Sequence, residues 1–345
     1  MQPKQIRPSS VSPLTGRRYG AVLCFSLLLG LPATLQAAPH IPSSESEVLE
    51  VLPTQLRGNN DPISRLRAQW RANPQDVTTV AALSRLYIET GREQSDPRYY
   101  GYAAALLQPW WQQTDPPDEL LLLRATIRQH NHEYVAATQD LEHLVKRNPA
   151  QTQAWLTLAT VQLVNKEYAA ARRSCSALAT HASTWFATLC YSQVMSQNGE
   201  AERAYPLQIT LLPSLGKEQV ELRQWVLTLL GETAARIGKV PEADQHFQAA
   251  LAEPRRDNYL LRVYSDFLIS QQRPLDVITL LQDKTSDDAL LLRLAIASRD
   301  ARQTAETARY QALLEARYQA AKLRGSTLHA EDEALYARTF GAATS

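Results

Sequence analysis

Apolar residues recur at helical spacing along most of this chain. From Val77 onward they return every three or four residues, and short polar turns interrupt the pattern. The strict alternation of apolar and polar residues that is typical of strands never persists. Gly91, Gly199 and Gly238 stand where one predicted helix ends and the next begins, and glycine suits the left-handed residue of a helix C-cap. The pattern predicts an all-α chain with about seven helical hairpins over 77–320.

The helical pattern repeats with a period of 34 residues. Apolar residues fall on apolar residues when 121–149 is set over 155–183, and again when 227–251 is set over 261–285. A fixed period of this size is typical of repeat proteins, in which each unit buries its apolar face by stacking on the next. The sequence therefore predicts a solenoid, and an extended solenoid surface favours binding over chemistry.

The two ends of the predicted stack differ from its middle. Asp61 and Pro62 begin a helix that lacks a preceding partner, and we expect this half repeat to cap the N-terminal end. At the other end the pattern predicts helices over 304–323 and 327–340, which places the solenoid within 61–340. No polar capping repeat follows them, so we expect the C-terminal end to be completed by a partner or by self-association.

The first residues have the pattern of an export signal. Four basic residues precede the apolar run of 21–31, and small residues follow near Ala37. The run is shorter than the roughly 20 residues that a membrane span needs. We therefore predict a secretory signal peptide over 1–37 that is cleaved, a polar lead-in segment over 38–60, and a periplasmic or otherwise exported protein.

Removal of the signal would change the charge balance only slightly. The full chain has 36 basic and 35 acidic residues, and the signal contains four basic and no acidic ones, which leaves 32 basic residues and a net charge of −3. A near-neutral chain lacks the basic surface that binds nucleic acid, so we expect no nucleic-acid partner. No second apolar run approaches membrane length, so we expect no integral membrane span after signal removal.

Two cysteines remain after the signal, Cys175 and Cys190. The repeat alignment puts them in consecutive helices that pack side by side, and an exported protein meets an oxidising compartment. We therefore predict a disulfide between them, with a pair of buried free thiols as the alternative. Two ligands are too few for a zinc site, so we predict no metal centre. His130 and His132 fall at a turn between helices, and we interpret them as polar turn residues.

Two of the repeat units carry the residue pattern of a known family. In one of them, large apolar residues flank small ones at the expected helix contacts: Trp155, Leu158, Ala159, Tyr168, Ala171 and Leu178. The other mixes large and small residues in a similar way: Leu230, Gly231, Gly238, Ala243, Phe247, Ala250 and Leu251. These units resemble tetratricopeptide (TPR) repeats, and the chain resembles a bacterial exported TPR protein. The resemblance implies a right-handed superhelical solenoid whose concave face, lined by the first helix of each hairpin, binds a protein or peptide.

The repeat alignment places a mixed polar set on that concave face. Its members carry amide, hydroxyl and charged groups: Arg85, Thr126, Gln129, Thr160, Gln193, Gln197, Glu232, Arg236, Arg262 and Asp266. Such groups suit an extended or helical peptide of mixed polarity. A solvated face without a ligand is the alternative for the same residues. Glu232 and Arg236 lie one helical turn apart and are also expected to form a weak surface ion pair.

Aromatic residues are concentrated in one short segment. Five of them fall within 92–111, in a chain that is 7% aromatic: Tyr99, Tyr100, Tyr102, Trp110 and Trp111. Tyrosine and tryptophan dominate interface hot spots, so this segment is a candidate recognition patch. The alternative is structural, with the rings covering the exposed N-terminal end of the stack.

Chemical motifs give no indication of catalysis. The sequence contains no Gly-rich phosphate loop, no nucleophile elbow and no zinc-protease helix motif. We therefore expect no enzyme activity and no cofactor. The pattern favours a periplasmic scaffold or adaptor that binds a protein or peptide through its concave face. The alternative is a helical assembly subunit of an envelope complex that exports or modifies polysaccharide, with the catalytic partner on a separate chain.

Overall fold

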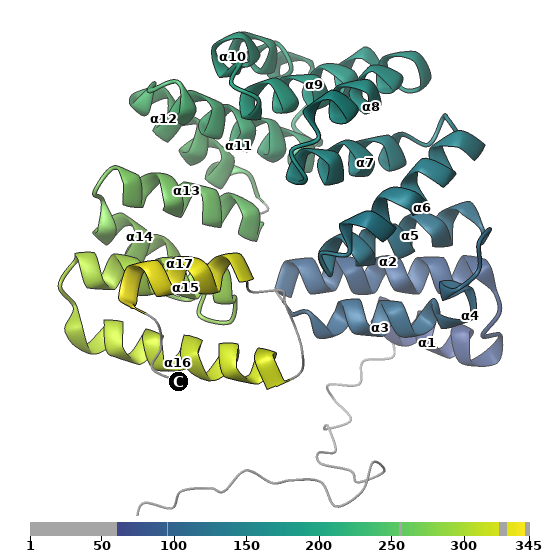
Figure 1. Cartoon of the computed structure of the whole chain (residues 1–345), viewed down its shortest axis with the longest axis horizontal. Helices are drawn as coiled ribbons and strands as arrows, with labels where there is room; N and C mark the ends of the chain where they lie inside the picture. The colour runs from purple at the N-terminus through teal and green to yellow at the C-terminus, as the bar shows by residue number, and fades with distance from the viewer. Residues whose placement is uncertain (1–60, 95, 255–256, 324–329, 342–345) are drawn as a thin grey trace, which may run out of the picture. The chain divides into compact units, whose positions relative to one another are not determined.

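Helices account for all regular structure in the described part of the chain (Figure 1). The computed structural model describes residues 61–341 except 95, 255–256 and 324–329, and these residues belong to one compact unit, Arg57–Ser345. The predicted signal peptide and lead-in segment lie outside the described residues. None of the described helices is long and apolar enough to cross a lipid bilayer. In chain order the elements, including one short 3-10 helix (η2), are α1 (Pro62–Ala72), α2 (Val77–Gln94), α3 (Arg98–Leu106), α4 (Gln108–Trp111), α5 (Asp118–His130), α6 (Tyr134–Arg147), α7 (Thr152–Val164), α8 (Tyr168–His181), α9 (Thr184–Gln197), α10 (Ala201–Ile209), η2 (Leu212–Ser214), α11 (Val220–Arg236), α12 (Val240–Ala252), α13 (Asn258–Ser270), α14 (Pro274–Leu281), α15 (Asp288–Asp300), α16 (Thr304–Leu323) and α17 (Ala330–Phe340).

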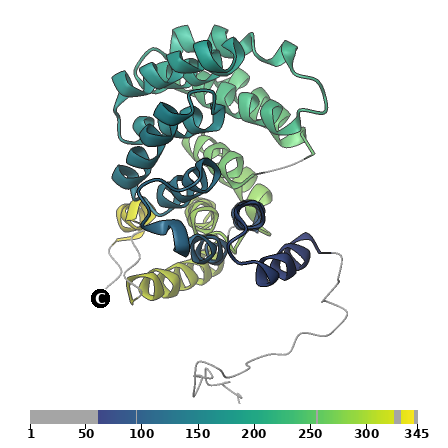
Figure 2. The same cartoon turned by 90° about the vertical axis from the view of Figure 1, so that its right-hand side faces the viewer.

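Consecutive helices pack in pairs. The pairs within the described residues are α2 with α3, α5 with α6, α7 with α8, α9 with α10, α11 with α12, α13 with α14, and α15 with α16. The first helix of each pair also contacts the first helix of the next, so these helices form one continuous layer (Figure 1, Figure 2). The prediction of an all-α solenoid of helical hairpins is confirmed.

A left-handed residue lies in the turn of each hairpin from α5 onward. Gly199 and Gly238 have φ angles of 81° and 73°, as predicted for C-cap glycines. The other four turns place a non-glycine residue there with φ between 55° and 61°: His132, Lys166, Gln272 and Arg302. Non-glycine residues adopt this conformation at an energetic cost. The stacking of the units therefore imposes the turn even where the residue type does not favour it.

In the first hairpin none of the described turn residues is left-handed, and the prediction for Gly91 is wrong. Gly91 is buried inside α2, which is 18 residues long against 13 for α5. A Cβ atom at this position would lie 3.1 Å from atoms of both Tyr99 and Tyr100. Glycine is needed here because the backbone of α2 closely approaches these side chains, and not because of a left-handed conformation.

A second close approach joins α11 and α12 and carries a testable consequence. A Cβ atom on Gly231 would lie 2.7 Å from the ring of Phe247. We expect Gly231→Ala to lower the free energy of unfolding by about 1–2 kcal/mol, because overpacking outweighs the gain in helix propensity. Gly101→Ala is the matched control, since a Cβ on this exposed helical glycine would meet nothing within 4 Å. Urea denaturation should show that the control stabilises by about 0.5–1 kcal/mol, and equal effects would contradict the packing role of Gly231.

Helix α17 covers the end of the stack that the sequence left open. Tyr336 is 4% exposed, and Leu335 and Phe340 pack beside it against the core of the last hairpins. Asp332 accepts a hydrogen bond from the Arg293 guanidinium of α15 at 2.6 Å. The chain therefore supplies its own cover for this end, although self-association there stays a prediction.

A disulfide joins Cys175 in α8 to Cys190 in α9, as predicted, with the two Cα atoms 5.4 Å apart. Both side chains are buried. The bond links the second helix of one hairpin to the first helix of the next, so it holds two consecutive units of the solenoid together.

Candidate functional site

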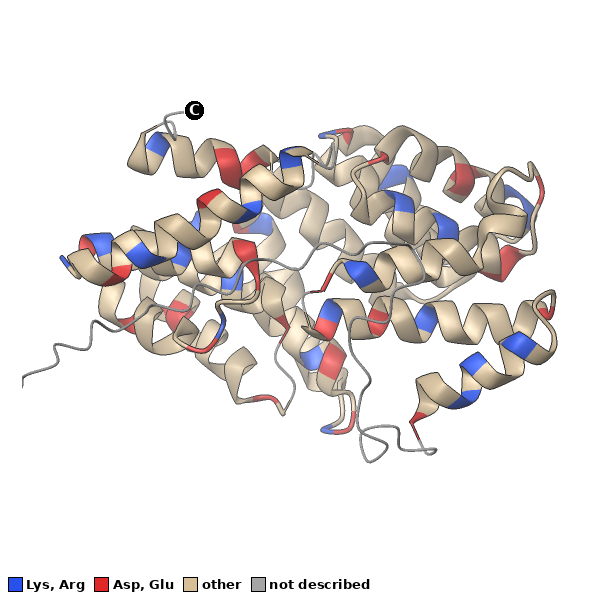
Figure 3. Cartoon of the chain, turned by 90° about the horizontal axis from the view of Figure 1, so that it is seen from below, with Lys and Arg blue, Asp and Glu red and all other residues tan. Residues whose placement is uncertain are grey.

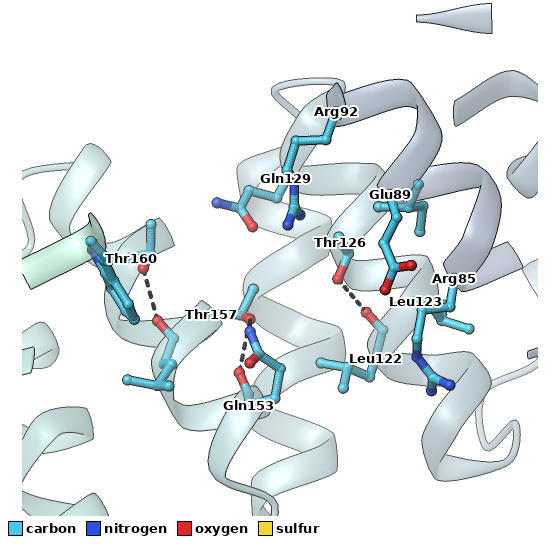
Figure 4. A pocket seen from close by; sticks show the side chains of 13 residues that line it. Arg85, Glu89, Arg92, Leu122, Leu123, Thr126, Gln129, Gln153, Thr157 and Thr160 are labelled. Atoms are coloured by element: carbon cyan, nitrogen blue, oxygen red, sulfur yellow. Dashed lines mark hydrogen bonds between the residues drawn. The ribbon is translucent and has the colours of Figure 1, made fainter. Parts of the chain in front are cut away.

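The first helices of three consecutive hairpins form the wall of a cavity. Residues of α2, α5 and α7 line it, Trp225 of α11 borders it from a more distant hairpin, and its volume is about 420 Å³. We call it the concave cavity. Figure 4 shows most of these side chains pointing toward a common space. Four of the predicted groove residues line it: Arg85, Thr126, Gln129 and Thr160.

The two threonines of the concave cavity that the sequence predicted, Thr126 and Thr160, use their hydroxyl groups within their own helices. Thr126 Oγ1 donates to the carbonyl of Leu122, and Thr160 Oγ1 donates to the carbonyl of Leu156, each at 2.9 Å (Figure 4). Both leucines line the cavity as well, together with Trp225. The wall is therefore more apolar than the sequence predicted, because the hydroxyl protons are already engaged.

Two charged side chains in the concave cavity, Glu89 and Arg92, form no ion pair with another residue that the structure describes. Arg85 is paired with Glu119 at 2.6 Å. Glu89 and Arg92 also line the cavity and are exposed, and neither forms an ion pair with another described residue. The Gln129 amide lies near Arg92 in Figure 4. These three groups can meet a ligand without first breaking a contact within the protein.

Four other predicted residues line a much smaller recess. Gln193 and Gln197 of α9 share it with Glu232 and Arg236 of α11, and its volume is about 10 Å³. The Arg236 guanidinium lies 4.0 Å from the Glu232 carboxylate, which is the weak ion pair that the sequence predicted. A space of this size is too small for a ligand side chain, so the predicted groove divides into a cavity and a shallow polar strip.

Glu232 is the carboxylate of that strip with the most unusual surroundings. Its side chain is 16% exposed, and the Tyr259 hydroxyl donates to its two oxygens at 3.0 and 2.9 Å. Burial raises the pKa of Glu232, although this hydrogen bond and the nearby Arg236 oppose the shift. Desolvation of the Tyr259 hydroxyl beside this carboxylate also raises the pKa of Tyr259, although its side chain as a whole is 40% exposed. The pair is therefore a structural contact between α11 and α13.

The last two predicted groove residues contribute to contacts within the protein. The Arg262 guanidinium lies over the Tyr259 ring at 5.3 Å from its centroid. Asp266 accepts hydrogen bonds from the buried Arg293, with a shortest distance of 2.9 Å. Neither residue lines the concave cavity. Asp266 is better explained as a partner for Arg293 than as a ligand contact.

The candidate aromatic patch is largely part of the core. Tyr100 and Trp110 are 8% and 7% exposed, and Tyr99 and Trp111 pack against the same cluster of the first hairpin. Only Tyr102 among the five is exposed, at 45%. The packing of Tyr100 and Trp110 with residues of α1, α2 and α5 favours the structural alternative for these two residues.

Sequence reasoning missed Trp225, although the repeat contains a signal for it. Tyr191, Trp225 and Tyr259 follow one another at intervals of 34 residues in α9, α11 and α13. An aromatic residue therefore recurs at one position of three successive first helices. Arg92 was missed as well, although the shift of 34 residues sets it on Thr126 and, one unit further, on Thr160.

The histidines do not form a metal site with other described residues. The His130 ring stacks on Tyr100 with centroids 3.4 Å apart. His132 Nδ1 shares a hydrogen bond of 2.9 Å with the Tyr134 hydroxyl. In the described ranges, no three His, Cys, Asp or Glu side chains converge as metal ligands. Basic and acidic residues are interspersed along the helices that Figure 3 shows, rather than gathered by sign.

The comparisons with known proteins add little to this description. No family model matches the chain, and no curated protein is similar to it. It is similar to a solved tetratricopeptide repeat protein from Parabacteroides merdae, with a TM-score of 0.46 and 15% identity over 73% of this chain and 90% of that one. It is also similar to a chain of the APC/C Cut9–Hcn1 hetero-tetramer, with a TM-score of 0.46, 14% identity and coverage of 73% and 48%. Human IFIT1, solved as a dimer with PPP-AAAA, has a TM-score of 0.45, 16% identity and coverage of 73% and 57%.

Proposed function

We propose that this protein is an exported, non-enzymatic adaptor that binds a segment of another protein in the concave cavity. The observation that supports this function is the composition of the cavity. An apolar surface lies beside the Arg92 guanidinium, the Glu89 carboxylate and the Gln129 amide. Neither of the two charged groups forms an ion pair with a described residue. Binding sites typically combine apolar area with a few such polar groups.

The cavity suits an extended peptide of mixed polarity. Leu122, Leu156 and Trp225 can take an apolar side chain, and tryptophan is enriched among interface hot spots. Arg92 and Glu89 both belong to α2, so they can pair with charges on one side of that residue. The Gln129 amide can both donate to and accept from a peptide backbone. The consecutive first helices place these groups along one direction, as recognition of an extended chain requires.

Export is part of the proposal and rests on two observations. The signal pattern of the first 37 residues is one, and the disulfide between Cys175 and Cys190 is the other. Disulfides persist in oxidising compartments such as the bacterial periplasm and are rare in the cytosol. We therefore propose a periplasmic or otherwise exported location for the adaptor. Cell fractionation with an antibody against the mature chain would test this placement, and recovery in the cytosol would contradict it.

Two substitutions in the cavity test the proposed function. Trp225→Ala is expected to weaken binding by about 2 kcal/mol, because it removes the aromatic anchor. Arg92→Glu reverses the available cation and is expected to weaken binding of an acidic partner at least as much. The partner is first recovered by affinity purification from the native cell envelope, and its affinity for each variant is then measured by calorimetry.

Arg71→Glu is the matched control for the charge change. Arg71 is an exposed arginine at the end of α1 and does not line the cavity. Loss of the partner in both cavity variants but not in this control would support the proposal. Retention of the partner by both cavity variants would overturn it. Recovery of a single enzyme complex independent of the cavity would favour the alternative role as an assembly subunit.

A further inference from the structure

A second cavity lies between hairpins from opposite ends of the sequence. Its volume is about 520 Å³. One side comes from α2, α3 and α5, and the other from the α13, α15, α16 and α17 region; Figure 1 shows these helices near one another. We call it the end cavity. A volume of this size falls in the range that holds small ligands.

One wall of the end cavity is aromatic. The rings of Tyr100 and His130 stack face to face, with centroids 3.4 Å apart and planes inclined by 3°. Ala289 and Ala320 line the other side, and Gly91 is beside the stacked pair. The stacked pair contributes aromatic surface to the cavity wall, and an aromatic ring of a ligand packs well beside such rings in an offset or edge-to-face arrangement.

His130 offers a hydrogen-bonding atom within this wall. Its Nε2 is buried and has no hydrogen-bond partner in the described residues. Burial, with the nearby charges of His132 and Arg92, lowers the pKa of His130 to about 4. The ring is therefore neutral at neutral pH and does not repel a cation or attract an anion. A ligand with a polar atom at the edge of its ring can satisfy the unpaired nitrogen.

The carboxylates of the end cavity are already engaged. Asp287 caps α15 by accepting a hydrogen bond from the Leu290 amide at 2.9 Å. Asp288 is paired with Arg317 at 2.7 Å, and Asp332 is paired with Arg293 at 2.6 Å. A ligand that bound one of these carboxylates would have to break a helix cap or an ion pair of the folded protein.

Arg92 is the charged group of the cavity that lacks such a contact. It lines both the end cavity and the concave cavity, and it forms no ion pair with a described residue. The charged group that a ligand can pair with is therefore the Arg92 guanidinium, even though the wall contains several aspartates. A carboxylate can form a charge-assisted, bidentate hydrogen bond with a free guanidinium group.

We propose that the end cavity is a second binding site, which takes an aromatic ring that carries a carboxylate on a short tether. The ring lies against the Tyr100–His130 stack, a hydroxyl or similar atom on the ring meets His130 Nε2, and the carboxylate meets Arg92. Two sources share this chemistry: a free aromatic acid, and a tyrosine beside an acidic residue in a peptide. The two proposed sites share Arg92, and the other groups that hold the ring lie in the end cavity alone.

The test is a titration of the purified full-length protein with 4-hydroxyphenylacetate, followed by NMR of the histidine side chains. The His130 signal is assigned by its loss in His130→Gln. The expected result is a saturable shift of this signal. Tyramine, which has the same ring with a cation in place of the carboxylate, should bind about tenfold more weakly or not at all. Equal binding of both compounds would overturn the proposal, and no shift at millimolar concentration would overturn it for a free aromatic acid.

Cavity-filling variants locate the site. Ala320 lines the end cavity but not the concave cavity, and Ala316 is an exposed residue one turn earlier on α16. Ala320→Phe is expected to abolish the titration, whereas Ala316→Phe should leave it unchanged. Binding that persists in Ala320→Phe would overturn the assignment to this cavity. Trp225 lines the concave cavity but not the end cavity. Loss of the protein partner in Trp225→Ala with normal 4-hydroxyphenylacetate binding therefore separates the two proposals.

A third arm distinguishes the two sources of the ligand. The capped dipeptide acetyl-Glu-Tyr-amide presents the same ring and carboxylate on a peptide backbone. Tighter binding of the dipeptide than of 4-hydroxyphenylacetate would indicate a peptide ligand, and weaker binding a free aromatic acid. Failure of both compounds to bind would overturn the proposal for both sources.

Discussion

Asp140→Ala is expected to lower the free energy of unfolding by about 3–5 kcal/mol. Asp140 of α6 lies between Arg124 and Arg128 of α5, and the side chains of Asp140 and Arg124 are each 7% exposed. Arg124 donates to both carboxylate oxygens, at 2.9 and 2.7 Å, and Arg128 donates to one of them at 2.6 Å. Alanine at position 140 would leave two guanidinium groups largely buried without their anion.

The effect should extend beyond the α5–α6 hairpin. Arg124 Nη1 also donates to the backbone carbonyls of Trp110, Trp111 and Gln113, at 2.9, 2.8 and 2.9 Å. The carboxylate of Asp140 thus orients a side chain that holds α4 against α5. When the anion is lost, Arg124 is expected to move toward water and release these carbonyls. Hydrogen exchange of the segment around Trp110 should therefore accelerate in the variant.

Asp115→Ala provides a matched control. Asp115 also accepts hydrogen bonds from an arginine and a histidine, Arg147 and His143, but its side chain is 67% exposed. An exposed ion pair of this kind contributes about 1 kcal/mol or less. Urea denaturation followed by circular dichroism measures both variants under the same conditions. If Asp140→Ala lowers the free energy of unfolding by as little as Asp115→Ala does, the buried cluster does not stabilise the fold in the way we describe.

Reduction of the disulfide between Cys175 and Cys190 is expected to lower the free energy of unfolding by about 3 kcal/mol. The bond closes a loop whose ends are 15 residues apart in sequence. Its loss would allow the unfolded chain more conformations. In the folded protein it joins α8 to α9, so the contact between those two hairpins is the part of the solenoid that depends on it. In a solenoid each unit is stabilised by its neighbours.

Denaturation with and without a reducing agent measures this effect. The double variant Cys175→Ala, Cys190→Ala is the control, because its urea midpoint should not change when the reducing agent is added. A thiol assay confirms that the wild-type bond has been reduced. If reduced and oxidised wild-type protein unfold at the same urea concentration, the cross-link contributes no stability and its role lies elsewhere.

The helices and their pairing could be predicted closely from the sequence. The predicted helix over 304–323 coincides with α16, and the turns at Gly199 and Gly238 have the expected left-handed conformation. Both features depend on residues within a few positions of each other. Gly91 failed as a turn signal because the same residue type also serves close packing, and only the neighbouring side chains of Tyr99 and Tyr100 distinguish the two uses.

The candidate site was predicted in part. The repeat alignment identified the face of each first helix, and Arg85, Thr126, Gln129 and Thr160 do line one cavity. The alignment could not show which polar groups remain available to a ligand. Thr126 bonds to its own helix, whereas Arg92 remains outside any ion pair with a described residue. Such differences depend on the neighbours of each side chain in space.

Buried charge is the feature that the repeat pattern concealed. Positions 128 and 140 correspond to positions 162 and 174 of the next unit at the shift of 34 residues. There, Ser174 donates to Gln162 at 2.7 Å, in a neutral version of the contact between Arg128 and Asp140. The alignment shows a polar pair at both places, but it does not show that one pair carries charge into the interior.

The sequence by itself determined that this protein consists of helical hairpins stacked with a period of 34 residues, because helix formation, turns and stacking are set within one or two units. Only the tertiary structure decided how the units curve. Small rotations between successive hairpins add up along the chain, and no local pattern contains their sum. That sum brings Trp225 to the cavity wall formed by α2, α5 and α7, and it places Arg92 in one cavity with residues of α15, α16 and α17.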